Sequence, residues 1–226
     1  LEGYLETLER VLDLEEPPEH ISAYSLILEE GTPLYEKHRA GLLELPDEDM
    51  DRLMYQETKR ILAWHGYHRY EISNYAREGF ECRHNCGYWR RKNYAGFGIG
   101  AASLVENVRF RNGADLGSYM EKPLGCREEV HSLSRQEQME ETLFLGLRMA
   151  EGVSPEAFEE QFGQSLREVY GSVVDRNIRE GLLVWRDCRE LPGNSVCSGK
   201  GGRSSVRLAL TERGLDLSNY VMAQFL

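Results

Sequence analysis

The spacing of apolar residues predicts an alternation of helices and strands in the first part of the chain. Apolar side chains recur at helical intervals over residues 1–14, whereas residues 20–28 run apolar and alternate like a buried strand. A second helix is expected to begin after Asp47, a suitable N-cap, and to end at Gly66, and residues 67–75 resemble another strand. This alternation is typical of an α/β fold with a parallel sheet.

The pattern becomes mainly helical from Ser134 onward, after two strand-like pieces at residues 94–105 and 107–110. Three helices are predicted: residues 138–149, a helix starting at 154–156, and residues 166–180. Two short strands, 182–185 and 206–210, flank a Gly/Ser-rich loop at 192–205, and a closing helix follows residue 211. Such an order suggests a winged-helix-like α+β domain. We therefore expect two domains, residues 1–128 and 129–226.

Composition and charge indicate a cytoplasmic, globular protein. Of 226 residues, 41% are hydrophobic and 29% charged, and no apolar run approaches the ~18 residues of a membrane span. Five cysteines, an odd number without dense spacing, are expected to be reduced thiols. The net charge of -11 disfavours nucleic acid as a partner, and residues 131–226 are also acidic, with 11 Lys and Arg against 14 Asp and Glu.

The densest chemistry lies in residues 83–92, which combine an imidazole, a thiol, a phenol, an indole and four cations. A flat, anionic, iron-bearing ligand such as heme needs an axial donor, aromatic faces and cations for its propionates. His84 is the candidate donor, and the cations are Arg83, Arg90, Arg91 and Lys92. The alternatives are a loop histidine bonded to a backbone carbonyl and a solvated charge run. Gly87 favours a loop here, although in a helix His84 and Tyr88 would share one face.

Two metal interpretations of the same segment are weaker. Cys82 and Cys86 have the first interval of the Cys-x3-Cys-x2-Cys motif that holds a [4Fe-4S] cluster, but Trp89 stands where the third cysteine belongs. A zinc site at Cys82, His84 and Cys86 lacks a fourth donor nearby in sequence. Cys86 is also a low-ranking competitor of His84 for iron.

Several motifs together carry a family resemblance. HNCGYW, residues 84–89, resembles the His-Asn-x-x-Tyr-Trp heme-binding signature of the HemW proteins, which are radical S-adenosylmethionine (SAM) relatives of the oxygen-independent coproporphyrinogen III oxidase. Other stretches agree in the same order: HISAYSLILEEGTPLY at 20–35, GYHRYEISNYAREG at 66–79, YAGFGIGAAS at 94–103, and the closing LTERGLDLSNYVMAQFL. The resemblance spans essentially the whole chain.

The resemblance implies a fold and a set of sites. The fold would be α/β: the C-terminal part of a radical SAM partial (β/α) barrel, followed by a winged-helix-like α+β domain. His84 would be the heme iron ligand, and Asn85, Tyr88 and Trp89 would shape its pocket. By similarity to the oxidase, Ile27 and Ala102 would touch SAM.

The resemblance also implies a function: binding heme and delivering it to hemoproteins. The [4Fe-4S] cluster and most of the SAM site would belong to an N-terminal half that precedes this chain, so we expect no catalytic residue here. A homodimer stays open. Two alternatives remain: an oxygen-independent coproporphyrinogen III oxidase of porphyrin biosynthesis, and an interaction module with a zinc-stabilised loop.

Overall fold

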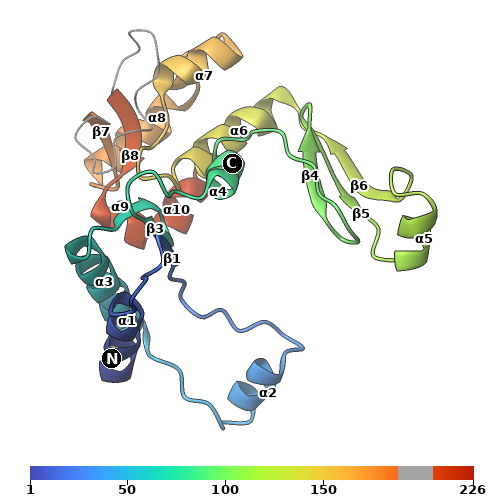
Figure 1. Ribbon diagram of the computed structural model, residues 1–226. Helices are drawn as coiled ribbons and strands as arrows, with labels where there is room; N and C mark the ends of the chain where they lie inside the picture. The colour runs from blue at the N-terminus through green and yellow to red at the C-terminus, as the bar shows by residue number, and fades with distance from the viewer. Residues whose placement is uncertain (188–205) are drawn as a thin grey trace. The chain divides into compact units, whose positions relative to one another are not determined.

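The computed structural model describes residues 1–187 and 206–226, and their contacts separate into two units (Figure 1). The first unit is Leu1–Glu81 and the second is Cys82–Leu226. This division lies inside the first predicted domain, and the boundary at 128/129 stays a prediction. The predicted Gly/Ser loop at 192–205, with Cys188 and Cys197, lies outside the described residues.

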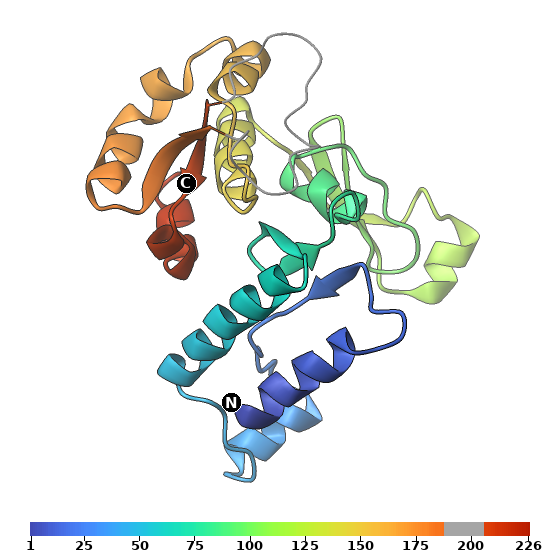
Figure 2. The same cartoon turned by 60° about the vertical axis from the view of Figure 1, so that its left-hand side comes forward.

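The first unit packs two long helices together beside a small sheet. Its elements are α1 (Glu2–Leu12), β1 (His20–Ser22), α2 (Pro33–Arg39), α3 (Glu48–Trp64), β2 (His68–Glu71) and β3 (Asn74–Ala76). Helices α1 and α3 contact each other and run side by side (Figure 2). Asp47 caps α3 as predicted, accepting a hydrogen bond from the Met50 amide at 2.8 Å, and Gly66 has the positive φ, +84°, expected after a helix.

The sheet of this unit corrects two expectations. Its order is β1-β3-β2 and both pairings are antiparallel, so the predicted parallel sheet was wrong for these strands. The predicted strand at 67–75 is a hairpin, since only two residues separate β2 from β3 and so short a connection joins antiparallel strands. Strand pairing also ends at Ser22, and Leu26 and Ile27, expected to be buried, are 59% and 80% exposed.

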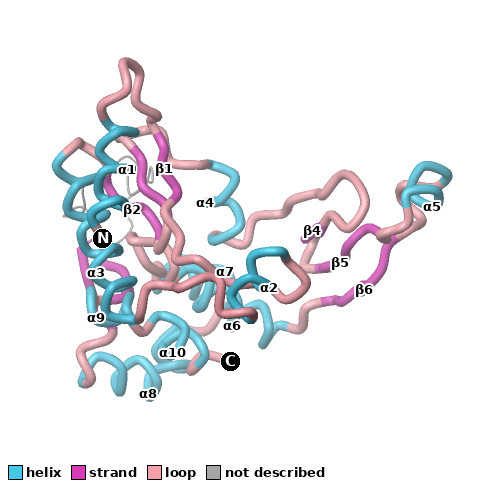
Figure 3. The backbone as a smooth tube through the Cα atoms, turned by 90° about the horizontal axis from the view of Figure 1, so that it is seen from below, coloured by secondary structure: helices cyan, strands magenta, loops and turns pink. Residues whose placement is uncertain are grey.

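The described residues of the second unit form helices and two antiparallel sheets. Its elements are α4 (Arg83–Trp89), β4 (Ala102–Val105), β5 (Val108–Asn112), α5 (Leu116–Glu121), β6 (Arg127–Ser132), α6 (Arg135–Gly146), α7 (Pro155–Phe162), α8 (Leu166–Arg179), β7 (Leu183–Asp187), β8 (Val206–Leu210), α9 (Glu212–Asp216) and α10 (Ser218–Ala223). Strands β4, β5 and β6 form one sheet with α5 at its far end (Figure 3), and β7 pairs with β8.

The sequence pattern correctly predicted the β7–β8 sheet and helices α6, α7 and α8. The predicted helices at 138–149, 154–156 and 166–180 are α6, α7 and α8, and each begins at a serine whose side chain accepts a backbone hydrogen bond. The predicted strands at 182–185 and 206–210 are β7 and β8. Strand β6 and helices α2 and α5 were not expected. All six residues of β6 are exposed, so no alternation of apolar and polar residues marks it.

Gly152 joins the segment after α6 to β8. Val153 and Leu208 exchange two backbone hydrogen bonds, of 2.8 and 2.9 Å. Gly152, just before this bridge, has φ +72°, and a Cβ there would lie 2.2 Å from the Leu208 carbonyl oxygen. Only glycine therefore allows the approach.

We expect Gly152→Ala to destabilise the chain by more than about 2 kcal/mol, because a strained φ and a collision with backbone add together. Urea unfolding followed by tryptophan fluorescence measures the change. Gly171→Ala, inside α8 with its nearest neighbour 3.7 Å from the added carbon, is the matched control and should stabilise by roughly 0.5–1 kcal/mol. Equal effects of the two substitutions would contradict this account.

The start of α6 is held by a capping box. Ser134 accepts a hydrogen bond from the Glu137 amide, and the Glu137 carboxylate accepts one from the Ser134 amide at 2.7 Å. Hydrogen bonds from Ser134 and then from His131 lower the pKa of Glu137 to about 2.

A group whose pKa is lowered by folding adds stability above its unfolded pKa and loses it as pH falls through the folded value. Wild type should therefore be more stable than Glu137→Gln at neutral pH, and the two should converge as pH falls from about 4.5 to about 2. Thermal melting across this range measures the difference. A difference that stays constant with pH would show that the carboxylate charge is not the cause.

Candidate functional site

Residues 83–92 form helix α4 and its C-terminal end, not the loop that Gly87 suggested. A helical glycine costs roughly 0.5–1 kcal/mol relative to alanine. Packing of α4 against α6 offsets that cost, since Cys86 is 6% exposed and Trp89 is half-buried. The helix places each residue of the predicted site at a defined position around its axis.

His84 is exposed at the first turn of α4, and its ring contacts the ring of Tyr88. Its ring lies edge-on to Tyr88, with centroids 4.4 Å apart, as expected for residues four apart on a helix. Tyr88 meets Tyr94 in the same way at 4.5 Å. Neither ring nitrogen of His84 has a hydrogen-bond partner in the described part of the chain. Among these described residues, no carbonyl binds His84.

Tyr94 was not identified from the sequence, where it only opens a glycine-rich stretch. Its amide and carbonyl pair with Leu104 of β4, which fixes the position of the ring beside Tyr88. Burial of its hydroxyl raises the pKa of Tyr94, and the Arg109 guanidinium offsets part of that rise. The role of Tyr94 depends on its pairing with Leu104, ten residues away, and a local sequence pattern does not predict such a pairing.

Trp89 belongs to a different side of α4. The Arg148 guanidinium lies 4.3 Å from the centre of its indole ring, a cation–π contact between α4 and the end of α6. Trp89 also lines two cavities, neither of which is lined by His84 or Tyr88. Asn85 is half-buried. The structure thus brings His84 and Tyr88 together and leaves Trp89 to anchor the helix.

Two of the four predicted propionate partners are already paired with carboxylates. Arg91, with a side chain only 5% exposed, donates to Glu141 at 2.8 Å and to Asn107 at 2.9 Å. Arg90 donates to Glu151 at 2.9 Å. Arg83 and Lys92 are exposed, and within residues 1–187 and 206–226 neither has an acidic partner.

Glu141 is the centre of this arrangement and was missed by sequence reasoning. It lies on α6 among buried apolar residues and binds both Arg91 and Arg109, the latter at 2.7 Å. Glu141 is 8% exposed, so its charge is stabilised by two guanidinium groups and not by water. A charged residue on the apolar face of a predicted helix was the available signal.

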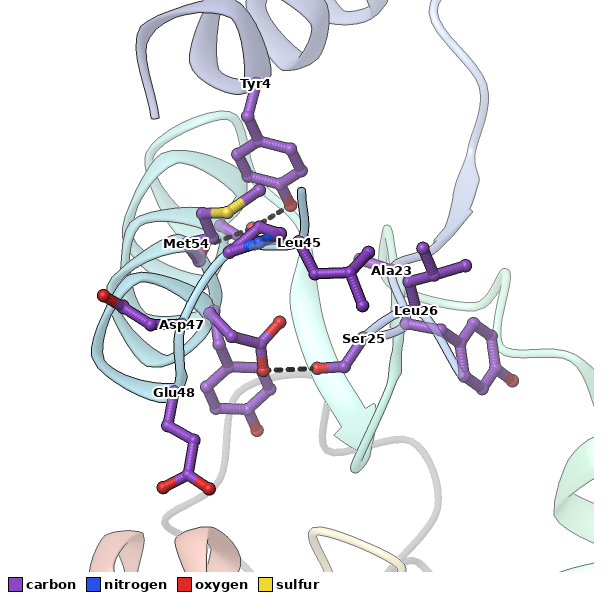
Figure 4. Close-up of a pocket in the computed structure, with 13 residues that line it drawn as sticks. Tyr4, Ala23, Ser25, Leu26, Leu45, Asp47, Glu48 and Met54 are labelled. Carbon is purple, nitrogen blue, oxygen red and sulfur yellow. Dashed lines mark hydrogen bonds between the residues drawn. The ribbon is translucent and has the colours of Figure 1, made fainter. Parts of the chain in front are cut away.

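The residues expected to contact SAM, Ile27 and Ala102, are both exposed. Ile27 belongs to the first unit and Ala102 to the second. The first unit has a cavity of about 450 Å³ between α1, α3 and residues 23–26, where Ser25 donates to Asp51 at 2.8 Å (Figure 4). Ile27 does not line it. Both SAM contacts stay proposals.

The zinc interpretation finds no support in the described residues, because no three His, Cys, Asp or Glu side chains there are grouped to hold a metal ion. Cys82 is half-buried, and Cys86 lies on the buried face of α4. No helix in the described ranges is long and apolar enough to cross a membrane.

Removing the Glu141 carboxylate is expected to loosen α4. Glu141→Ala leaves the buried Arg91 charge without its acid, which should lower the free energy of unfolding by about 3 kcal/mol. Glu140→Ala, at the preceding position of α6, should change it by less than about 0.5 kcal/mol, because among the described residues the Glu140 carboxylate accepts a hydrogen bond from Gln136 alone. Urea unfolding of both variants tests this. The prediction fails if the two variants lose the same stability.

Several known proteins resemble this chain in sequence. A family model described as the HemN C-terminal domain matches residues 133–189. The heme chaperone HemW of Lactococcus lactis is 36% identical over 97% of this chain and 53% of its own length, and that of Bacillus subtilis is 38% identical over 92% and 51%. A mitochondrial protein of Danio rerio named radical S-adenosyl methionine domain-containing protein 1 is 35% identical over 74% of this chain.

A solved structure shares the fold. The coproporphyrinogen III oxidase HemN of Escherichia coli, named as a radical SAM enzyme, superimposes with a TM-score of 0.69 over 99% of this chain and 51% of its own. Sequence identity is 16%, so this similarity bears on the fold alone. It confirms the expected α/β class and the relation to the radical SAM fold. The chain spans about half the length of the curated relatives it matches.

Proposed function

The chain is a relative of the HemW heme chaperones, and from that premise we propose that it binds heme through His84 and takes part in heme delivery to hemoproteins. The observation that carries the proposal is the state of His84: exposed, on a fixed helix, with both ring nitrogens free of partners in the described chain. An axial ligand needs an accessible neutral imidazole nitrogen.

The surrounding residues take separate roles in this proposal. Tyr88, in edge contact with the imidazole, limits its rotation and offers an aromatic face to the macrocycle together with Tyr94. Asn85 follows His84 on the same helix and completes the polar edge of the site. Trp89 positions α4 through Arg148 and does not have to touch the ligand.

The propionates are assigned to Arg83 and Lys92. Both are exposed and have no acidic partner among the residues described, so binding a carboxylate breaks no existing ion pair. Arg90 and Arg91, predicted for the same role, would first have to leave Glu151 and Glu141. An exposed ligand site also suits a carrier, because an acceptor protein can approach the bound heme directly.

The [4Fe-4S] cluster and SAM belong to this proposal only through the longer relatives. The Cys-x3-Cys-x2-Cys motif is absent from these 226 residues, so this chain would contribute contacts such as Ile27 and Ala102 but no cluster ligand. We keep the cytoplasm as the proposed location.

A second candidate function is coproporphyrinogen III oxidation, favoured by the fold shared with HemN. An iron-free porphyrinogen needs no axial imidazole, so that reaction leaves the exposed His84 unexplained. Turnover by a full-length protein, with SAM present, would support the oxidase. Heme binding that depends on His84 supports the chaperone.

Hemin titration followed by absorbance of the Soret band tests the proposal. We expect His84→Ala to weaken binding at least about tenfold, the minimum seen when even an outer-shell partner of a metal ligand is lost. The low-spin spectrum of an imidazole-ligated iron should disappear in the same variant. His65→Ala, an exposed histidine after α3, is the matched control and should bind as wild type does. Unchanged binding by His84→Ala would refute the assignment.

A further inference from the structure

A polar cleft of about 370 Å³ lies within the second unit, away from His84. It is lined by the end of α4, by α6, by α7 and by β8. The side chains that matter are Trp89, Arg90, Glu151, Ser154, Phe158 and Arg207. None of these has a role in the heme site beyond the anchoring of α4 by Trp89.

The charged groups of the cleft are unequally paired. Arg90 binds one oxygen of Glu151 at 2.9 Å. The Arg207 guanidinium comes no nearer than 3.9 Å to the other oxygen of that carboxylate, which is too long for a hydrogen bond. Arg91 also reaches the cleft wall but is neutralised by Glu141. Among the described residues that line the cleft, Arg90 and Arg207 thus share the one carboxylate of Glu151. A second carboxylate, that of Glu156, accepts a hydrogen bond from Ser154 at 3.1 Å.

Hydrogen bonds in the cleft are also incomplete. Three buried polar atoms lack a hydrogen-bond partner in the part of the chain that the structure describes: Glu151 Oε2, Arg207 Nε and Trp89 Nε1. Two of them are donors, and buried donors are normally satisfied by protein, water or ligand. Arg207 is therefore only partly satisfied by its protein partners, although Nε itself is covered and a ligand oxygen would have to meet the other nitrogens of its guanidinium.

The positions of these groups are fixed by the backbone. Gly152 holds the segment of Glu151 against β8, and Val153 and Leu208 exchange hydrogen bonds one residue further along each segment. Arg207, next to Leu208, also donates to the Gly152 carbonyl at 3.5 Å. The cleft is therefore preformed, which lowers the entropy lost when a ligand binds.

The remaining wall is apolar. Val153 and Phe158, which are 6% and 1% exposed, also line the cleft. A ligand that matches both walls carries one carboxylate and a short hydrocarbon part.

We propose that this cleft binds a small alkyl carboxylate, with Arg207 as its principal partner and Glu151 as the internal carboxylate that competes with it. The guanidinium fork is suited to a carboxylate. The proposal does not depend on heme binding at His84. The same chemistry has two sources, a free organic acid or the propionate arm of a porphyrin.

Sodium butyrate is the probe, and the indole N–H signal of Trp89 in a ¹H–¹⁵N spectrum of the full chain is the reporter. Trp89→Phe assigns that signal among the three tryptophans. We expect the signal to shift saturably with butyrate, and not with butyramide or with sodium chloride of equal ionic strength. A shift that is equal with butyramide, or no shift at all, overturns the proposal.

Two variants and one control make the test specific. Arg207→Gln should weaken butyrate binding roughly tenfold or more, since a charged hydrogen bond is lost, whereas Arg167→Gln, an exposed arginine on α8, should bind as wild type does. Glu151→Gln should bind butyrate more tightly, because the competitor is gone. A damaged fold cannot produce tighter binding, so failure of Glu151→Gln to gain affinity also overturns the proposal.

The source of the carboxylate is decided with zinc protoporphyrin and its dimethyl ester. A Trp89 shift with the diacid and not with the ester identifies a porphyrin propionate, and a shift with butyrate alone identifies a free acid. His84→Ala should leave butyrate binding intact. Loss of heme binding in that variant, with butyrate binding kept, separates this cleft from the proposed heme site.

Discussion

The carboxylate of Glu141 is the interaction on which the candidate site depends. It is 8% exposed and binds Arg91 at the end of α4 and Arg109 on β5, so one buried anion ties a helix and a sheet to α6. A buried ion pair contributes little to stability compared with an apolar contact, but removing one partner is costly because the other charge stays buried. The bridge therefore acts mainly by allowing one arrangement of these elements and excluding others.

That arrangement explains why His84 faces solvent. Glu141 holds the end of α4 through Arg91, Arg148 covers the indole of Trp89, and Cys86 is buried beneath the helix. With one side of α4 occupied in this way, the imidazole of His84 is left on the open side. Because Tyr88 follows His84 by one helix turn, its ring contacts the imidazole. Backbone pairing of Tyr94 with Leu104 of β4 places the Tyr94 ring against Tyr88.

Local pattern predicted the elements whose signals are local. Helices α6 and α8 begin at serine caps that the sequence displays, whereas residues 20–28 have the pattern of a buried strand yet pair only to Ser22. Helix α4 was missed because Gly87 is a weak helix former and the packing that favours the helix comes from α6, far along the chain. The roles of Tyr94 and Glu141 were not predicted for the same reason, since they arise from contacts between distant segments.

Helix α4 is expected to be folded on α6 already before any ligand binds. Amide hydrogen exchange of residues 86–92, measured with and without hemin, tests it directly, because the amides of Cys86, Arg90 and Lys92 donate within the helix and its end. We expect strong protection of these amides in the free chain and little change when hemin is added. Rapid exchange in the free chain, with protection gained only on adding hemin, would contradict it.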